Sequence, residues 1–154
     1  MNNITILSDS PQTTRDIGFK IGLALRGGEI ICLLGELGAG KTCLSQGIIN
    51  GVCNRKDYPR SPTFSIINPH TGRFPIYHID LYRLEKRADI FETGVEELIN
   101  SKETLLIEWA EKIAYLDIPD RIEVTIDDLG EEKREIKVSG APAHIEEIFR
   151  EMEL

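Results

Sequence analysis

An apolar run followed by a glycine-rich loop is the strongest constraint on how this chain folds. Residues 30–34 read Ile-Ile-Cys-Leu-Leu, and residues 35–42 spell G-E-L-G-A-G-K-T, which matches the pattern G-x-x-x-x-G-K-[ST]. In this pattern glycines let backbone N–H groups converge on phosphate oxygens, the lysine reaches the β- and γ-phosphates, and the hydroxyl ligates Mg²⁺. The motif needs a strand before it and a helix after it, and residues 42–46 suit a helix. The sequence therefore predicts a bound nucleoside triphosphate on the loop 35–42, here called the phosphate loop.

Length and composition predict a single domain spanning residues 1–154. The chain has 154 residues, of which 41% are hydrophobic, enough for one sizeable core. No apolar stretch approaches the roughly 20 residues of a membrane span, and the N-terminus lacks the basic region and long apolar segment of a signal peptide. The three cysteines show no C-x-x-C spacing, which argues against a zinc site or a disulfide framework. We expect a cytoplasmic protein without a membrane partner.

The formal net charge of −8 disfavours direct binding of nucleic acid by this chain alone. Sequence-independent binding to RNA or DNA rests largely on neutralisation of phosphates by Lys and Arg. The acids concentrate in residues 92–97, 127–132 and 146–153. Such clusters form either a solvated face or a contact surface for a basic partner, and the sequence leaves both interpretations open.

Hydrophobic periodicity predicts alternating strands and helices along the chain. Ser10 and Pro11 supply the cap and first residue of the first helix, and Gly94 interrupts a later one. The predicted class is α/β, a three-layer P-loop NTPase-like fold with a mostly parallel central sheet, antiparallel hairpin strands and helices on both faces. The expected strands are 3–7, 29–34, 65–68 with 74–79 as a hairpin around a turn at 69–72, 104–107, and 121–126 with 134–138 as a hairpin. The expected helices are 12–25, 41–51, 86–99 and 143–152.

Two acids compete for the metal position that a phosphate-loop enzyme needs at the end of a neighbouring strand. Asp80 ends the run 74–79, but Pro75 cannot donate to a ladder and the run carries polar residues, which suits an edge or hairpin strand. Glu108 ends an uninterrupted apolar run, which suits the centre of the sheet beside the strand that enters the phosphate loop. We therefore expect Glu108 to hold Mg²⁺ together with Thr42.

Other candidates have two interpretations each. Asp80 either orients or deprotonates the attacking water or acts on the metal through a bound water. Thr63 is either a switch residue that senses the γ-phosphate or an ordinary turn threonine. Arg83 is either a source of transition-state charge or a solvated or partner-contacting arginine. Trp109, the only tryptophan, suits a core or interface anchor more than a catalyst, and His78 is isolated from Cys and other His residues, which argues against a metal role.

The motifs together resemble the bacterial TsaE (YjeE-type) ATPase family over nearly the whole chain. HIDLYRL and IEW are the specific segments, whereas the phosphate loop alone is shared by many families. The matching segments are the phosphate loop, S-P-T-F at 61–64, H-I-D-L-Y-R-L at 78–84, I-E-W at 107–109, T-R-D-I-G at 14–18 and Arg134. The sequence departs from the family pattern at Glu36, where aspartate is common, and at Cys43, where a second threonine is common. Neither change removes a phosphate donor or the magnesium hydroxyl.

The resemblance implies an ATP-binding and ATP-hydrolysing accessory protein, weakly active alone and stimulated by partners. Its family is required for threonylcarbamoyl modification of the adenosine next to the anticodon of certain tRNAs. The transferase in that family is a separate TsaD-TsaB heterodimer, on which the ATPase docks. The tRNA would then be held by the partners, in agreement with the acidic composition.

The resemblance also implies site residues. The catalytic residues would be Lys41, Asp80, Glu108 and Trp109, and Mg²⁺ would be held by Thr42 and Glu108. The residues around ATP, with ADP as product, would be Leu37, Gly38, Ala39, Gly40, Lys41, Thr42, Cys43 and Thr63, with Pro11, Thr14 and Arg134 near the adenine and ribose.

Two other functions remain open. A small-molecule kinase would use the same loop, but little of the chain is left to form an acceptor pocket and an arginine-bearing lid. An ATP-gated assembly switch without useful hydrolysis is also open, because Asp80 and Glu108 could serve binding alone. A guanine-specific switch fits poorly, because the lysine of N-R-K-D at 54–57 is displaced by one position from the base-recognition pattern.

Overall fold

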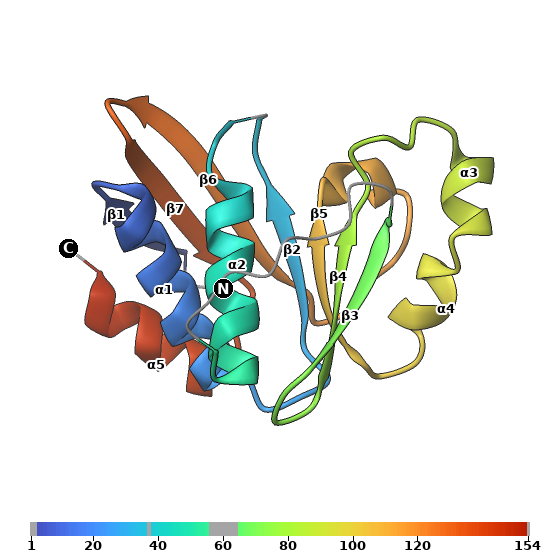
Figure 1. Ribbon diagram of the computed structural model, residues 1–154, viewed down its shortest axis with the longest axis horizontal. Helices are drawn as coiled ribbons and strands as arrows, with labels where there is room; N and C mark the ends of the chain where they lie inside the picture. Colours follow the sequence, from blue (N-terminus) through green and yellow to red (C-terminus); the bar gives the residue numbers. More distant parts are fainter. Residues whose placement is uncertain (1–2, 37, 56–64, 154) are drawn as a thin grey trace.

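The computed structural model describes residues 3–36, 38–55 and 65–153, so two predicted site residues, Leu37 and Thr63, lie outside the described residues. Seven strands form one sheet, and helices lie on both of its faces (Figure 1). The elements in chain order are β1 (Ile4–Ser8), α1 (Pro11–Ala24), β2 (Ile30–Leu34), α2 (Lys41–Cys53), β3 (Ile67–Thr71), β4 (Pro75–Asp80), α3 (Arg87–Glu92), α4 (Val95–Ile99), β5 (Thr104–Glu108), the 3₁₀ helix η1 (Ala110–Ile113), β6 (Ile122–Gly130), β7 (Lys133–Ser139) and α5 (Ala143–Met152).

The strand order is β1-β7-β6-β2-β5-β4-β3. The four central strands, β6, β2, β5 and β4, run parallel. The outer pairings, β1 with β7, β6 with β7 and β3 with β4, are antiparallel. This arrangement confirms the predicted α/β class, the parallel centre and both hairpins, and it places β5 directly beside β2.

The place of β4 agrees with the prediction of an edge or hairpin strand. β4 is the inner strand of a hairpin, because β3 pairs with its outer side. Pro75 is tolerated because it is the first residue of β4, where the missing N–H disturbs the ladder least. The edge strand on this side of the sheet, β3, contains Pro69 and covers residues 69–71 of the predicted turn 69–72, while the turn itself lies around Gly72.

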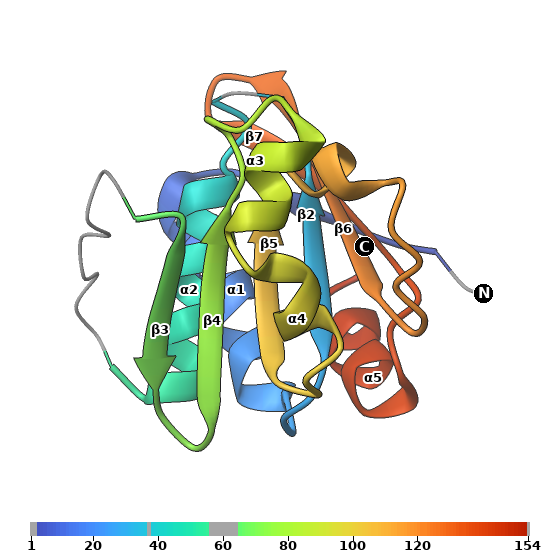
Figure 2. The ribbon, with the colours of Figure 1, turned by 90° about the vertical axis from the view of Figure 1, so that its right-hand side faces the viewer.

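Two hydrophobic clusters form the core, one on each face of the sheet. Buried residues of α1, α2 and α5 pack against one face, with Leu33 and Leu106 among the strand residues pointing toward them. Residues of α3, α4 and η1 pack against the other face with Leu105 and Ile107. Figure 2 shows α3 and α4 in front of the sheet with α1 and α2 behind it. β5 is buried on both faces, which explains its continuous apolar sequence.

The helices α1 and α2 pack closely side by side. Gly18 and Gly22 of α1 face Gly47 and Gly51 of α2, and an added Cβ at any of them would collide with the backbone of the other helix. The contacts advance along both helices in the same direction, so the two helices are parallel and begin at the same end of the molecule (Figure 1). This end is also where the parallel strands finish.

Local signals explain most of the helix boundaries. Ser10 caps α1, since its hydroxyl accepts from the Thr13 N–H at 3.1 Å, and Pro11 is the first helical residue, as predicted. Gly94, at φ 85°, separates α3 from α4 within the predicted helix 86–99. Of the helices described, none has the length and apolar character needed to cross a membrane.

Candidate nucleotide-binding site

The phosphate loop joins the carboxyl end of β2 to the first turn of α2. Gly35, Gly38 and Gly40 all have positive φ, at 149°, 82° and 108°. A Cβ on Gly35 would lie 2.5 Å from the Ile126 carbonyl oxygen, so the loop packs directly on β6. No side chain caps α2 after Gly40, which leaves the N–H groups of its first turn for an anion. The predicted strand, loop and helix are thus in the arrangement that phosphate binding requires.

Lys41 is the first residue of α2 and is almost entirely buried. Its ammonium group donates to the Gly35 carbonyl and lies 3.3 Å from the centroid of the Trp109 ring. Burial lowers the pKa of Lys41, whereas the negative charges of Glu111, Glu108 and Asp80 oppose that shift. The lysine therefore lies among the carboxylates predicted to act with it.

Asp80 and Glu108 occupy equivalent positions at the ends of adjacent parallel strands. They are register partners in the pairing of β4 with β5, so their side chains point to the same face. Glu108 is also the register partner of Leu33, which belongs to the core under α1 and α2, so that face is the one on which α2 begins. The Leu81 N–H donates to the Glu108 carbonyl at 3.3 Å and holds the two strand ends together.

The two acids differ in their surroundings. Glu108 is 4% exposed, whereas Asp80 is half-buried and its carboxylate accepts from the Tyr82 N–H at 3.0 Å. Glu108 also contacts His78, whose Nε2 lies against its carboxylate. This contact was not predicted from the sequence, in which His78 is isolated from Cys and other His residues. Alternation along β4 was the available signal, since residues 78 and 80 must point to the same face.

The donor atoms at this point suit magnesium. The described residues contain no group of three or more His, Cys, Asp or Glu side chains placed to hold a metal ion. Mg²⁺ does not require one, because it usually binds through one or two carboxylates, water and substrate phosphates. Thr42, exposed at the second position of α2, and Glu108 supply the hydroxyl and carboxylate oxygens that such an ion takes.

Trp109 directly follows the strand end and has the left-handed backbone conformation, at φ 61° and ψ 40°. Its ring lies beside that of Tyr82, with centroids 5.1 Å apart. Lys112 joins the same group, since its ammonium donates to the carbonyls of Tyr82 at 2.6 Å and Leu84 at 2.7 Å. A non-glycine residue in this conformation is strained and persists only when surrounding contacts hold it. Here the contacts come from Lys41, Tyr82 and Lys112.

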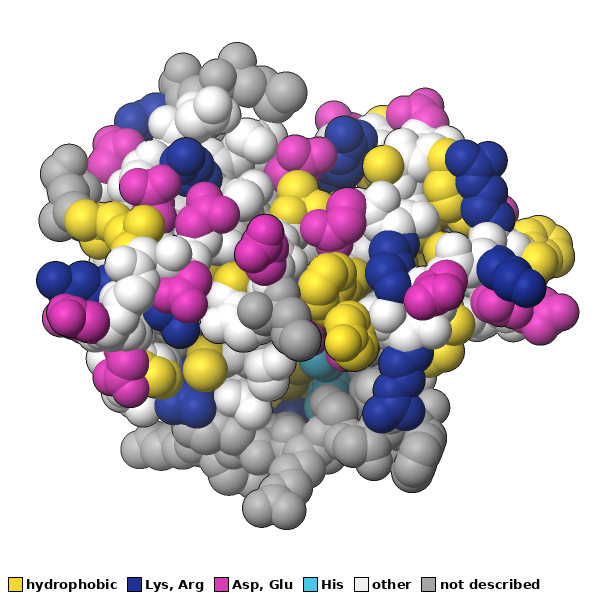
Figure 3. All heavy atoms as spheres, turned by 90° about the horizontal axis from the view of Figure 1, so that it is seen from above, with side chains coloured by type: hydrophobic (Ala, Val, Ile, Leu, Met, Phe, Trp, Pro, Cys, Tyr) yellow, Lys and Arg dark blue, Asp and Glu magenta, His cyan; other side chains and the backbone are white. Residues whose placement is uncertain are grey.

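A hollow of about 460 Å³ opens between the phosphate loop and Trp109. Gly35, Ala39 and Ile126 form part of its lining, and the acids Glu36, Glu111, Asp127 and Asp128 form the rest. Seen from this end, the molecule carries acidic side chains interspersed with basic and hydrophobic ones (Figure 3). The site is therefore open to a ligand beside the loop.

Arg134 of β7 reaches the phosphate loop from the far hairpin. Its guanidinium donates to Asp128 at 2.8 Å and to the Gly38 carbonyl at 3.5 Å. The structure thus brings Arg134 to the loop from almost 100 residues away in the sequence.

The remaining predicted residues lie at the starts of the two helices. Pro11 and Thr14 open α1, beside the first turn of α2, where Cys43 is half-buried. Thr14 is buried, and its hydroxyl contacts the Ser8 hydroxyl at 2.7 Å and the Ser10 carbonyl at 3.2 Å. The Thr14 hydroxyl therefore takes part in closing the first turn of α1. Arg83 is exposed on the turn after β4.

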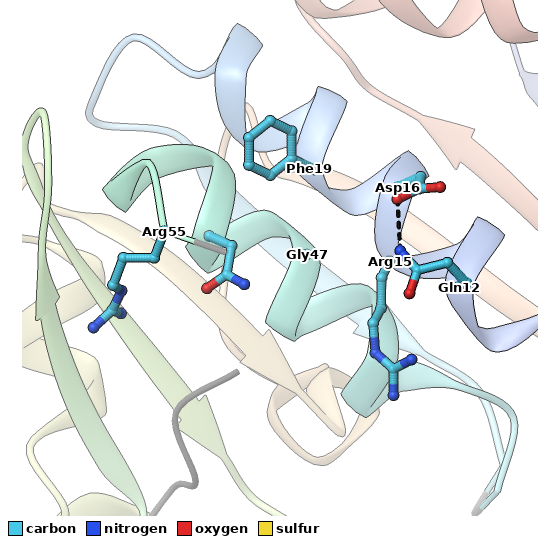
Figure 4. Close-up of a pocket in the computed structure, with 7 residues that line it drawn as sticks. Gln12, Arg15, Asp16, Phe19, Gly47 and Arg55 are labelled. Atoms are coloured by element: carbon cyan, nitrogen blue, oxygen red, sulfur yellow. Dashed lines mark hydrogen bonds between the residues drawn. The ribbon is translucent and has the colours of Figure 1, made fainter. Parts of the chain in front are cut away.

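A second hollow, of about 330 Å³, lies on the outer side of the α1–α2 pair (Figure 4). Gln12, Asp16 and Phe19 of α1 and Gly47 of α2 line part of it, and Gln12 donates to Asp16 at 2.8 Å. None of the predicted site residues lines it. The end of the sheet, rather than this hollow, gathers the residues predicted to bind the nucleotide.

Comparison with known proteins agrees with this geometry. Residues 8–136 match the sequence model of the family described as "Threonylcarbamoyl adenosine biosynthesis protein TsaE". Proteins named "tRNA threonylcarbamoyladenosine biosynthesis protein TsaE" are similar: that of Rickettsia felis is 38% identical, covering 84% of this chain and 75% of that protein. That of Treponema pallidum is 34% identical, covering 86% and 98% respectively.

A solved structure shows the same fold. The crystal structure of Bacillus subtilis YdiB superposes with a TM-score of 0.73 at 27% identity, covering 98% of this chain and 94% of that one. The family match extends from the end of β1 to β7 and includes the phosphate loop, Asp80 and Glu108. The chain therefore belongs to the TsaE family of tRNA threonylcarbamoyladenosine biosynthesis proteins.

Proposed function

We propose that this protein is a magnesium-dependent ATPase that supports threonylcarbamoylation of tRNA, acting on a TsaD-TsaB-like transferase. The observation that carries the proposal is the register of Asp80 with Glu108 at the strand ends, on the face where Lys41 and Thr42 begin α2. A phosphate loop with two acids at this position is the arrangement that supports phosphoryl transfer to water.

Each residue has a separate role in the proposed reaction. Backbone N–H groups of Gly38, Ala39 and Gly40, with Leu37, surround the phosphates, and the Lys41 ammonium moves from the Gly35 carbonyl to the β- and γ-phosphate oxygens. A bound Mg²⁺ would neutralise charge that develops on the phosphates. Thr42 and Glu108 are the residues that would hold that ion.

Asp80 and Trp109 complete the proposed machinery. Asp80 is less buried than Glu108, and we assign it the orientation or deprotonation of the attacking water, with action on the metal through a bound water as the alternative. Trp109 covers Lys41 and joins it to the turn after β4 through Tyr82. Arg134 contacts the loop from β7, and we assign it with Pro11, Thr14, Cys43 and Thr63 to the nucleotide surroundings.

The net charge of −8 supports an indirect relation to tRNA, which the partners would hold. We place this activity in the cytoplasm, within a single ATPase domain spanning residues 1–154. ADP would be the product that leaves the site. We expect slow hydrolysis by the protein alone and faster hydrolysis when the transferase is present.

Reconstitution of tRNA modification with a TsaD-TsaB heterodimer, with and without this protein, tests the proposal. We expect multiple-turnover yield only when the protein and ATP are both present, and ATP hydrolysis faster with the heterodimer than without it. Equal hydrolysis rates with and without partners would contradict the coupling. A phosphorylated small molecule as product would instead identify a kinase. Full tRNA modification in the presence of a Glu108→Gln protein that binds ATP without hydrolysing it would identify an assembly switch.

A further inference from the structure

The contact between His78 and Glu108 is buried and direct. Their side chains are 9% and 5% exposed, and His78 Nε2 lies against a carboxylate oxygen of Glu108. His78 comes from β4 and Glu108 from β5. The register of the two strands aligns His78 with Leu106, which precedes Glu108 by two residues and therefore points to the same face. The geometry is therefore set by the sheet and not by a flexible loop.

The hydrogen-bond pattern defines which ring nitrogen carries the proton. An ionised carboxylate only accepts hydrogen bonds, so Nε2–H must be the donor. Nδ1 of His78 is buried and has no hydrogen-bond partner among the described residues. Nε2 is therefore the ring nitrogen that faces Glu108 and donates to its carboxylate.

This contact leaves the rest of the Glu108 carboxylate for a ligand. A buried carboxylate without a donor would be strongly destabilised, and a free one would rotate about its terminal bonds. With one oxygen held by His78, the second has a fixed direction at the end of β5, the end from which α2 starts. Groups that orient a metal-binding side chain in this way contribute about 10-fold to 100-fold to metal affinity.

We infer that His78 is a positioning residue that orients Glu108 toward the magnesium ion of the nucleotide complex. The inference rests on the proposed function, because it assumes that Glu108 meets Mg²⁺. It assigns His78 no contact with nucleotide or metal.

Nucleotide binding with and without Mg²⁺ tests this role without measuring turnover. We expect His78→Leu to retain the ATP affinity seen in EDTA but to lower the Mg²⁺ affinity of the ATP complex by about 10-fold to 100-fold. His78→Gln, which can place an amide donor near the position of Nε2, should recover most of it. His144→Leu is the matched control, since His144 also contacts a glutamate, the half-buried Glu29, at 3.1 Å at the opposite end of β2.

A double-mutant cycle separates positioning from general loss of structure. In a Glu108→Gln background, His78→Leu should cause no further loss of Mg²⁺ affinity. Equal weakening of ATP binding in EDTA and in Mg²⁺ would overturn the inference, as would full Mg²⁺ affinity in folded His78→Leu. If the unmodified protein showed no Mg²⁺-dependent ATP binding at all, the proposed function and the role of His78 would both be overturned, whereas full Mg²⁺ affinity in His78→Leu would overturn the role of His78 alone.

Discussion

The ammonium nitrogen of Lys41 lies 3.3 Å from the centroid of the Trp109 ring, and the same ammonium donates to the Gly35 carbonyl. The lysine that should bind phosphate is thus engaged by its own loop and by the residue after β5. An ammonium that turns toward phosphate changes its contact with the ring, which links occupancy of the loop to the surroundings of Trp109.

The first prediction follows from this relationship. Trp109 is the only tryptophan, so fluorescence excited at wavelengths that the four tyrosines do not absorb reports it alone. Because the ammonium leaves the ring when it moves to phosphate, ATP should change the emission of the unmodified protein. Lys41→Gln should show altered emission before ATP is added and no further change after it. An unchanged spectrum at ATP concentrations that bind by calorimetry would contradict the displacement.

A second prediction concerns Lys112, which holds the turn after β4 to η1 through the carbonyls of Tyr82 and Leu84. Lys112→Met keeps much of the side-chain volume but removes both hydrogen bonds, each worth about 1 kcal/mol net. We expect the free energy of unfolding to fall by about 1–2 kcal/mol. We also expect hydrolysis to slow more than ATP affinity falls, because this turn directly follows Asp80 and is separate from the phosphate loop.

Chemical denaturation and parallel measurements of kcat and ATP affinity check this expectation. Lys20→Met, at an exposed position of α1, is the control and should leave all three quantities unchanged. A Lys112→Met protein with reduced ATP affinity and normal kcat would show instead that the hydrogen bonds of Lys112 support nucleotide binding by the phosphate loop.

The sequence was sufficient to predict the centre of this fold. The continuous apolar runs ending in the phosphate loop and at Glu108 are buried on both faces, so hydrophobicity alone identified β2 and β5 as central neighbours. The predicted bounds of β3 were wrong, because Pro69 was taken as a turn signal. Only the strand pairing shows that Pro69 lies in an edge strand, where proline is tolerated.

The candidate site was predictable where a motif carries it and not where separate strands meet. Lys41 and Thr42 followed from spacing alone. The approach of Arg134 to Gly38, the ring of Trp109 over Lys41 and the contact of His78 with Glu108 depend on which strands are neighbours and in which register. No local pattern encodes that register, so residue-by-residue reading left His78 isolated.

The third prediction is a pH dependence at Glu29. Burial raises the pKa of Glu29, but hydrogen bonds from the backbone of Arg26 and Gly27 and from His144 outweigh it, so the pKa lies below the ordinary value of 4.5. The folded state therefore binds a proton less readily than the unfolded state. Glu29 contributes stability that is fully present above about pH 4.5 and is lost as the pH falls through its lower folded pKa.

Glu29→Gln checks the sign of that effect. The variant should melt at a lower temperature than the unmodified protein at pH 7, and the difference should shrink when the pH is taken below 4.5. Glu151→Gln, at an exposed position of α5, should melt like the unmodified protein at both pH values. A difference that grows in acid would show that Glu29 is destabilising when ionised.

The fourth prediction separates the conformational role of a glycine from its role at the site. Gly38 and Gly94 have nearly the same positive φ, 82° and 85°, and an added Cβ would meet nothing within 4 Å at either position. Alanine at each should therefore lower the free energy of unfolding by a similar amount, about 1–2 kcal/mol, through backbone strain alone.

Only Gly38 lies in the phosphate loop. Gly38→Ala should weaken ATP binding by calorimetry, because a loop pushed toward negative φ turns its N–H groups away from the phosphates, whereas Gly94→Ala should bind ATP like the unmodified protein. Equal affinities in the two variants would show that the loop tolerates the change, and the phosphate contacts would then have to come from Lys41 and the first turn of α2.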